Sequence, residues 1–315
     1  MKSSFCKYSH FFKVALLSVI FAVHLSAKAE TLLVGCGEKY EKPSQAARVA
    51  KDGDTILIKK GVYIDVATWD ASNLTIKGME GAANTIIRFS DSIERIACGK
   101  ALWVVGGYNC RIEGVSFEGA KCPDKNAAGL WIGAAKGKTV VRQCKFTKNE
   151  NGILTPDHGE AELCIDECTF RDCGHGDGYS HNLYVGRIKK LVFKNSVSDH
   201  ALRGHNLKSR ARETEILNSV FDDGKDGVSS YLVNCPNGGK VSMKNCRLVQ
   251  SPMASNSMMI SIGEEGAYPD TVFNNIGNKL VNLRTSTTPK IFNSSWHIAT
   301  ENKKEYNNGV LRVKY

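Results

Sequence analysis

The sequence has little proline, with seven in 315 residues. Beyond its first 29 residues it also has no apolar run long enough to cross a bilayer. No Cys-x-x-Cys pair is followed by a second such pair, which argues against a zinc-binding module. The 11 cysteines are too few for a small disulfide scaffold, and 42% hydrophobic with 23% charged residues excludes an intrinsically disordered chain. We therefore expect a folded chain with a sizeable core.

Residues 1–29 have the composition of a secretory signal peptide. Basic residues precede an apolar stretch of about a dozen residues, which is too short for a transmembrane anchor. Ala27-Lys28-Ala29 then supplies a small-x-small cleavage site before Glu30. The leader holds four Lys and no acidic residue, so the net charge falls from +10 to +6 after cleavage. We expect a secreted or periplasmic protein with no remaining membrane anchor, and no nucleic-acid partner because no Lys/Arg stripe is present.

A degenerate repeat of roughly 23 to 30 residues fills most of the mature sequence. Its most regular part is a pair of apolar residues about five positions apart: Ile112/Phe117, Val141/Phe146, Ile165/Phe170, Val192/Val197, Ile216/Phe221, Met243/Leu248 and Val272/Ile276. A small or thiol residue follows three positions after the first member: Val115, Cys144, Cys168, Asn195, Ser219 and Cys246. Three short β segments per repeat, with polar corners, bury an apolar face only when successive coils stack. No repeat holds a ten-residue helical period. The repeat therefore predicts a single β-solenoid domain over residues 30–315.

The start of the mature chain carries a family resemblance. Residues 43–51 begin with Pro43 and have helical apolar spacing, so we expect a short helix there that caps the open end of the solenoid. Residues 52–63 then contain a Gly-Asp-Thr strand and a Gly-x-Tyr turn. This order resembles the first coil of right-handed parallel β-helix proteins of the pectate-lyase-like superfamily. The resemblance implies an all-β, single right-handed parallel β-helix with a short N-terminal capping helix. Residues 285–315 lose the repeat and are expected to cover the last coil.

The cysteines divide into two groups. Three of them occupy the repeated inward position and are expected to stack in the core as small apolar residues: Cys144, Cys168 and Cys246. The other seven of the mature chain lie nearer to corners: Cys36, Cys98, Cys110, Cys122, Cys164, Cys173 and Cys235. One or two disulfide bridges are expected among these seven because the protein is expected to be exported.

Polar residues gather where alternation predicts outward-facing positions on neighbouring coils. Tyr184, Lys208 and Leu232 are expected to form one column. Asn182, Asn206 and Ser230 are expected to form a second column, with Arg210 and Asn234 beside them. His181 and His205 stand just outside the strands, and residues 173–180 form an inserted corner loop. The candidate catalytic residues are therefore Lys208, Arg210, Tyr184, His181 and His205. The candidate substrate-binding residues are Asn182, Asn206, Ser230, Asn234, His158 and Arg187.

An acidic polysaccharide or oligosaccharide suits this set of side chains. Arg210 can clamp a carboxylate, while amides bind hydroxyl groups. β-Elimination next to a uronate needs a base (Lys208 or a histidine), a carboxylate neutraliser (Arg210 with an Asn) and an acid, Tyr184. The site is similar to those of superfamily members that are polysaccharide lyases or C5-epimerases. The sequence thus favours an exported lyase or epimerase that needs no cofactor and acts as a monomer.

Three alternatives remain open at this point. A glycoside hydrolase needs paired carboxylates, and the outward positions hold none, although acids at the corners could reach in. A non-catalytic carbohydrate-binding or surface protein would repeat similar residues along the whole face. Ca²⁺ is possible at Asp222, Asp223 and Asp226, where a plain glycine-rich corner is the simpler interpretation.

Overall fold

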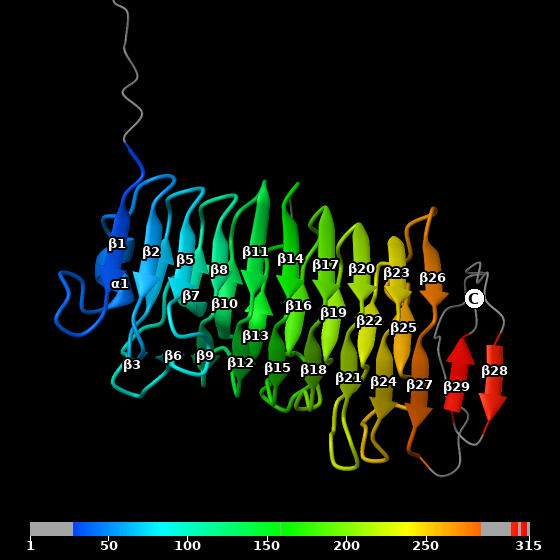
Figure 1. Ribbon diagram of the computed structural model, residues 1–315. Helices are drawn as coiled ribbons and strands as arrows, with labels where there is room; N and C mark the ends of the chain where they lie inside the picture. Colours follow the sequence, from blue (N-terminus) through cyan, green and yellow to red (C-terminus); the bar gives the residue numbers. More distant parts are fainter. Residues whose placement is uncertain (1–27, 158, 285–303, 308–309, 314–315) are drawn as a thin grey trace, which may run out of the picture.

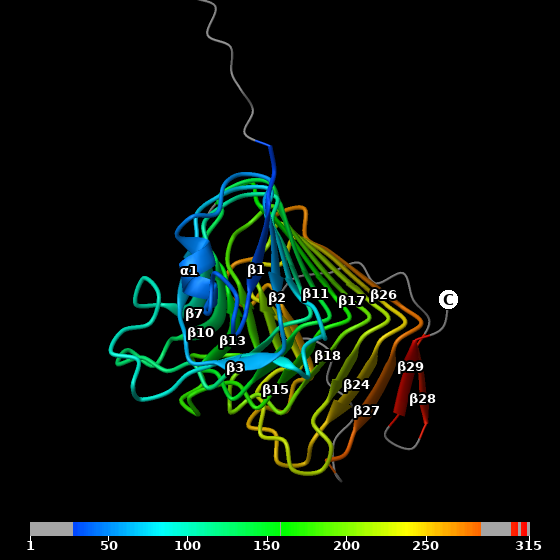
Figure 2. The same cartoon turned by 60° about the vertical axis from the view of Figure 1, so that its left-hand side comes forward.

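Short β-strands wind into a parallel solenoid with three faces (Figures 1 and 2). The structure, a computed structural model, describes residues 28–157, 159–284, 304–307 and 310–313. Each coil contributes one strand to each of three sheets, here named A, B and C in chain order, and corresponding strands of successive coils pair in parallel. The predicted all-β solenoid is confirmed.

From β2 to β27 the strands of each sheet follow the chain in steps of three. Sheet A contains β1 (Thr31–Val34), β2 (Thr55–Ile58), β5 (Thr75–Gly78), β8 (Arg111–Glu113), β11 (Lys138–Arg142), β14 (Glu162–Asp166), β17 (Lys190–Lys194), β20 (Glu213–Leu217), β23 (Lys240–Lys244) and β26 (Val272–Ile276). Sheet B contains β3 (Gly61–Tyr63), β6 (Thr85–Arg88), β9 (Ser116–Glu118), β12 (Lys145–Thr147), β15 (Thr169–Arg171), β18 (Val197–Asp199), β21 (Val220–Asp222), β24 (Arg247–Gln250) and β27 (Lys279–Asn282), then β29 (Val310–Val313) and β28 (Lys304–Asn307). Sheet C contains β4 (Ala67–Trp69), β7 (Ala101–Val105), β10 (Ala128–Ile132), β13 (Asn151–Leu154), β16 (Leu183–Val185), β19 (Leu207–Ser209), β22 (Val233–Cys235) and β25 (Ile260–Ile262).

The inside of the solenoid is filled by the repeated apolar residues. Phe117, Phe146 and Phe170 stack in successive coils, with ring centroids 5.1 and 4.7 Å apart and ring planes within 8° of parallel. Cys144 and Cys168 lie buried in the same interior, 1% exposed, and Cys246 is 2% exposed. The predicted cysteine ladder is confirmed. Stacking identical side chains every ~4.8 Å gives each coil a complete apolar neighbour on both sides.

Two of the predicted inward pairs are wrong. Strand pairing aligns Ile165 with Phe193, so Phe193 and Ser198 point inward and Val192 and Val197 do not. The ladder position is accordingly Ser196, whereas Asn195 has a left-handed backbone conformation at the corner between sheets A and B. Similarly, pairing of β23 with β26 makes Phe273 and Asn275 the inward residues, so the pair Val272/Ile276 is also wrong. In both coils an inward position holds a polar residue, Ser198 or Asn275, where we expected an apolar one.

The described cysteines form no disulfide bridge. All ten cysteines of the mature chain are free, and Cys110, Cys164, Cys173 and Cys235 are buried. The expectation of one or two bridges near corners is therefore wrong. Burial instead raises the pKa of the Cys173 thiol to about 12, which makes it an apolar packing group.

The two ends of the solenoid differ from its body. One helix, α1 (Pro43–Ala47), lies near β1 and is shorter than the predicted helix over 43–51 (Figure 1). Its role as a cap remains a prediction. At the other end β29 pairs antiparallel with β27 and so covers the edge that β27 would otherwise leave free in sheet B. Most of the predicted cap at 285–315 lies outside the described residues. Residues 1–27 of the predicted signal peptide also lie outside them.

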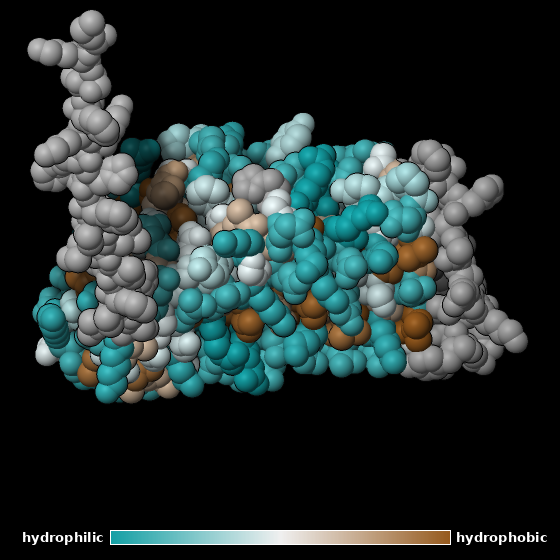
Figure 3. Space-filling view, turned by 90° about the horizontal axis from the view of Figure 1, so that it is seen from above, coloured by the Kyte–Doolittle hydropathy of each residue, from teal (hydrophilic) through white to brown (hydrophobic). Residues whose placement is uncertain are grey.

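The described surface is polar. The side of the molecule in Figure 3 is mostly hydrophilic, with hydrophobic side chains scattered over it. Within the described ranges no helix has the length and apolar character needed to cross a membrane.

Candidate functional site

The outer face of sheet C changes character along the solenoid. Strand pairing places one outward residue of each coil in a single column, from β4 to β25: Thr68, Val104, Trp131, Leu154, Tyr184, Lys208, Asn234 and Ser261. After Thr68, the next three are apolar and the last four polar. The predicted neighbours Tyr184 and Lys208 are thus in register, but Asn234 rather than Leu232 continues the column because Lys208 pairs with Asn234. The continuous run of polar residues begins at β16.

Arg210 is the centre of the polar cluster. It follows β19, and its guanidinium donates from Nε to the Tyr184 hydroxyl at 3.0 Å and from Nη1 to Asn237 Oδ1 at 2.7 Å. The remaining Nη2 donates to Glu265 Oε2 at 2.6 Å. The Arg210 side chain is only 12% exposed. Burial alone would lower the pKa of Arg210, but its bonds to Glu265 and Tyr184 raise it. Arg210 therefore holds a fixed positive charge beside a carboxylate.

Lys208 lies next to Arg210 on the same face and is poorly solvated. Its side chain is 14% exposed, with Nζ 3.6 Å from Glu265 Oε1 and 5.8 Å from the centre of the Tyr184 ring. Burial and the positive charge of Arg210 lower the pKa of Lys208 below its usual value, although Glu265 opposes this shift. A half-desolvated amine with a lowered pKa is suited to accept a proton.

Sequence reasoning missed the acidic loop that covers this cluster. We use this name for residues 263–270, which connect β25 to β26 and carry Glu264, Glu265 and Asp270. Glu265 contacts Arg210 and Lys208, Glu264 accepts a hydrogen bond from Asn234, and Asp270 pairs with Arg212 at 2.6 Å. Glu265 and Asp270 lie 55 and 58 residues from the arginines they bind, and the only signal in the sequence was the position of Glu264 and Glu265 between two glycines, which is typical of an exposed turn.

The two candidate catalytic histidines are buried beneath the cluster. His181 and His205 are 2% and 8% exposed, and their rings stack with centroids 4.6 Å apart. Backbone N–H groups donate to the Nδ1 atoms of both, from His205 to His181 and from Tyr231 to His205. Burial lowers the pKa of His205 to about 3 and places that of His181 well below its usual value. Both rings are neutral, and His181 stacks on Tyr184, which suits support of that side chain rather than contact with a ligand.

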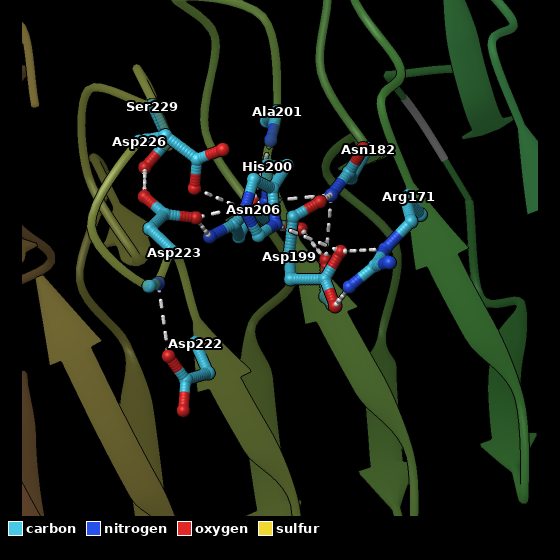
Figure 4. Close-up of polar contacts among 12 residues, drawn as sticks. Arg171, Asn182, Asp199, His200, Ala201, Asn206, Asp222, Asp223, Asp226 and Ser229 are labelled. Atoms are coloured by element: carbon cyan, nitrogen blue, oxygen red, sulfur yellow. Dashed lines mark hydrogen bonds and ion pairs between the residues drawn. The ribbon is translucent and has the colours of Figure 1, made fainter. Parts of the chain in front are cut away.

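Asn182 and Asn206 point into the solenoid, not outward as predicted (Figure 4). Asn182 Nδ2 donates to Asn206 Oδ1 at 3.0 Å, and Asn206 Nδ2 donates to Asp223 Oδ1 at 2.8 Å. Their amides also bind backbone groups of Cys173, Asp199 and Ala201. Both asparagines are 0% exposed, so they hold corners together and offer no contact to a substrate.

The remaining predicted binding residues lie in different surroundings. Asn234 is buried under the acidic loop, whereas Ser230 is half-buried at the corner before β22. Arg187 is half-exposed and pairs with Asp157 of the preceding coil. His158 lies outside the described residues. Of the predicted set, the structure therefore brings together Tyr184, Lys208, Arg210 and Asn234.

The three aspartates considered for Ca²⁺ point to separate partners (Figure 4). Asp222 pairs with Arg247, and Asp226 lies 3.4 Å from His200 Nε2. Asp223 is fully buried and accepts hydrogen bonds from Asn206, Ser229 and the His200 backbone. No cluster of three or more His, Cys, Asp or Glu suited to a metal ion occurs among the described residues. The corner is therefore a hydrogen-bonded turn and not a calcium site.

A pocket of about 650 Å³ lies away from this cluster, between the 89–100 loop and the corner at 121–125. Its buried carboxylate, Glu150, accepts hydrogen bonds from the backbone of Cys122 and Ala127. Because the Glu150 carboxylate already accepts hydrogen bonds from the backbone of the corner, we regard this pocket as a weaker candidate site than the outer face of sheet C.

Comparison with known proteins identifies the fold. No curated protein matches the sequence. Among solved structures, a pectin methylesterase from Erwinia chrysanthemi has a TM-score of 0.55 at 12% identity, covering 85% of this chain and 94% of that one. A pectin methylesterase from Aspergillus niger has a TM-score of 0.54 at 14% identity, covering 87% and 93%. A pectate lyase has a TM-score of 0.53 at 13% identity, covering 86% and 80%.

These similarities show a shared fold. The sequence itself matches the family described as "Right handed beta helix region" over residues 101–276. The match spans the coils that carry the polar cluster as well as those before it. The chain therefore belongs to the right-handed β-helix family.

Proposed function

We propose that this protein is an exported enzyme that acts on a uronic-acid-containing polysaccharide by β-elimination, as a lyase or C5-epimerase. The observation that carries the proposal is the poorly solvated amine of Lys208 beside the fixed charge of Arg210, with the Tyr184 hydroxyl on the next coil. Pectin-active enzymes among the structures of similar fold support a polysaccharide as the substrate class.

We assign one residue to each step of β-elimination. Arg210, oriented by Asn237, neutralises the substrate carboxylate and so acidifies the C5–H bond. Lys208 accepts the C5 proton, and the electron pair forms the C4–C5 double bond as the C4–O bond breaks. Tyr184, whose oxygen accepts a hydrogen bond from Arg210, keeps its own proton to donate to the leaving oxygen. In an epimerase the C5 carbanion is reprotonated from the opposite side instead.

The local character of the cluster favours an enzyme over a binding scaffold. After Thr68, the outward column is apolar at Val104, Trp131 and Leu154 and is continuously polar only from Tyr184 onward. A scaffold that binds a long polymer repeats its contacts along the whole face.

A glycoside hydrolase is the weaker alternative, although two carboxylates do reach the face from the acidic loop. Hydrolysis needs one protonated carboxyl as the general acid. Burial would raise the pKa of Glu265, but the hydrogen bond from Arg210 and the charge of Lys208 hold it below its usual value. Glu265 is therefore ionised where a hydrolase would need a proton donor.

We further propose that the enzyme is secreted or periplasmic, since residues 1–29 have the pattern of a cleaved leader. We also propose that it acts as a monomer.

The experiment is incubation with polygalacturonate, alginate and glucuronan while ultraviolet absorbance, reducing ends, methanol release and C5 configuration are followed. A lyase gives unsaturated uronate ends that absorb, and an epimerase inverts C5 without new ends. New reducing ends without absorbance, or methanol from methylated pectin, would instead indicate a hydrolase or an esterase and contradict the proposal.

A further inference from the structure

The carboxylate of Glu265 sits where the proposed mechanism needs a substrate carboxylate. Its Oε2 accepts from Arg210 Nη2 at 2.6 Å, and its Oε1 lies 3.6 Å from Lys208 Nζ. Arg210 and Lys208 are 12% and 14% exposed, whereas Glu265 is 47% exposed. Glu265 is thus the outer partner that lies over two otherwise buried cations.

Two glycines flank the glutamates of the acidic loop, and the Asp270–Arg212 ion pair holds its far end. Glycines with left-handed backbone conformations, Gly263 (φ 81°) and Gly266 (φ 98°), flank Glu264 and Glu265. The loop backbone donates from Glu265 to the Pro236 carbonyl and from Tyr268 to the Asn237 carbonyl, at 2.9 and 3.1 Å. Glycine at such positions permits a change of chain direction at little steric cost.

The surface beneath the loop is incompletely satisfied. In the described part of the chain, Asn234 Oδ1, Ser261 Oγ and Glu264 Oε2 are buried and have no hydrogen-bond partner. Asn234 and Ser261 are 0% exposed and continue the outward column directly after Lys208. Buried polar atoms without partners cost free energy. Their cost is removed when the loop lifts and solvent or the hydroxyl groups of a sugar reach them.

We infer that the acidic loop is an internal substitute for the substrate, with Glu265 occupying the carboxylate position on Arg210 and Glu264 covering a hydroxyl-binding surface at Asn234 and Ser261. The inference rests on the proposed function for the identity of the ligand. An acidic polysaccharide displaces the loop by supplying its own carboxylate to Arg210 and its hydroxyls to Asn234 and Ser261. A neutral polysaccharide lacks the group that replaces Glu265 and leaves the loop in place.

The first experiment follows amide hydrogen exchange in peptides that cover residues 263–270. Oligogalacturonate and oligomannuronate are the acidic probes, and a malto-oligosaccharide of equal length is the neutral one. Binding of an acidic probe is expected to speed exchange at the Glu265 and Tyr268 amides, which are hydrogen-bonded in the closed loop. Binding that slows exchange in the loop, or leaves it unchanged, would overturn the inference.

The second experiment compares Glu265→Gln with the matched variant Glu162→Gln. Glu162, on sheet A, pairs with Lys189 at 2.7 Å. Both variants lose one negative charge, with Glu265 losing its pairs with Arg210 and Lys208 and Glu162 its pair with Lys189. Glu265→Gln is expected to speed loop exchange without ligand and to bind the acidic probe about 3- to 10-fold more tightly, because less of the protein is closed. Equal affinities in the two variants, or no binding of either acidic probe to Glu265→Gln, would contradict the inference.

The two proposals fail in different ways. Loop displacement with neither an elimination product nor C5 inversion would refute the proposed function but not the inference about the loop. Elimination or inversion with an undisturbed loop would refute the inference about the loop but not the proposed function.

Discussion

Two polar clusters occupy the same coils, yet they have opposite properties. The inner cluster runs through Asn182, Asn206 and Asp223, is almost fully buried, and has its amides bonded to one another and to the backbone (Figure 4). The outer cluster of Lys208 and Arg210 is capped by a half-exposed carboxylate on a hinged loop. The type of a polar residue does not by itself show whether the residue stabilises the fold or is available to a ligand. What differs between the two clusters is whether the hydrogen-bond partners of the polar groups are fixed or can be exchanged.

Replacing the proposed base is expected to have the largest effect. Lys208→Met removes the proton acceptor while keeping the length of the side chain, and activity should fall about 10³-fold or more. Stability should stay close to wild type because the amine is poorly solvated and repelled by Arg210. Initial rates and thermal unfolding measured on the same preparation check this. Unchanged turnover in this variant would show that the outer cluster takes no part in catalysis.

Breaking the inner cluster should reverse that pattern. Asn206→Leu removes one hydrogen-bond partner from each of Asp223 and Asn182 inside the solenoid, and we expect a loss of about 2–4 kcal/mol in the free energy of unfolding. Turnover per folded molecule should be nearly unchanged, since Asn206 does not reach the outer face. Denaturant unfolding together with rates corrected for folded protein tests this. A stable but inactive variant would show that the inner cluster also takes part in catalysis, so that the two clusters form a single site.

Tyr184→Phe should have an intermediate effect on the outer cluster. The variant loses the proposed proton donor and the acceptor of the Arg210 Nε–H group, and we expect turnover to fall about 10²-fold. A uronate with a 4-O-aryl group, which leaves from C4 without needing a proton, should recover most of this loss. Absence of recovery would indicate that the hydroxyl only positions Arg210.

The pH profile distinguishes the proposed base from an ordinary lysine. Burial and Arg210 lower the pKa of Lys208, so the free amine forms at lower pH than in a lysine with the usual value of 10.5. Activity should therefore rise with pH through a midpoint below 10.5. In Glu265→Gln the midpoint should move lower still, because an attractive negative charge is lost. An unchanged midpoint in this variant would show that the ionisation seen in the pH profile is not that of Lys208.

The smallest effect is expected at the edge of the inner cluster. Burial would lower the pKa of His200, but Asp199, Asp226 and Asp223 together raise it above 6.5. A raised pKa in the folded state stabilises the protein fully below pH 6.5, and that contribution is lost as pH rises through the folded value. His200→Gln should therefore cost about 1 kcal/mol or less at pH 5.5 and less at pH 8.5. Thermal unfolding at the two pH values checks the sign.

The fold was accessible from sequence because stacking makes the same demand in every coil. Pairs such as Ile112/Phe117 and Ile165/Phe170 recur at coil spacing, and both members are buried. The register failed where a polar inward residue, Ser198, replaced an apolar one. Pattern matching then chose the nearby valines, which shifted the predicted pair by one residue.

The site was accessible only in part. Alternation along a strand correctly put Tyr184 and Lys208 outward and in register. At the corner alternation ends, because Asn182 and Leu183 are consecutive and both buried, so the asparagines were placed on the wrong side. Glu265 comes from two coils further along, and nothing in the repeat specifies that its loop folds back over Arg210.

The most direct test of the account is the absorbance of unsaturated uronate ends formed from polygalacturonate, alginate and glucuronan, with C5 inversion followed in parallel, by wild type, Lys208→Met and Asn206→Leu. The account predicts elimination or inversion by wild type and by folded Asn206→Leu, and a loss of about 10³-fold in Lys208→Met. Equal rates in wild type and Lys208→Met, or no elimination and no inversion on any of the three polymers, would contradict it.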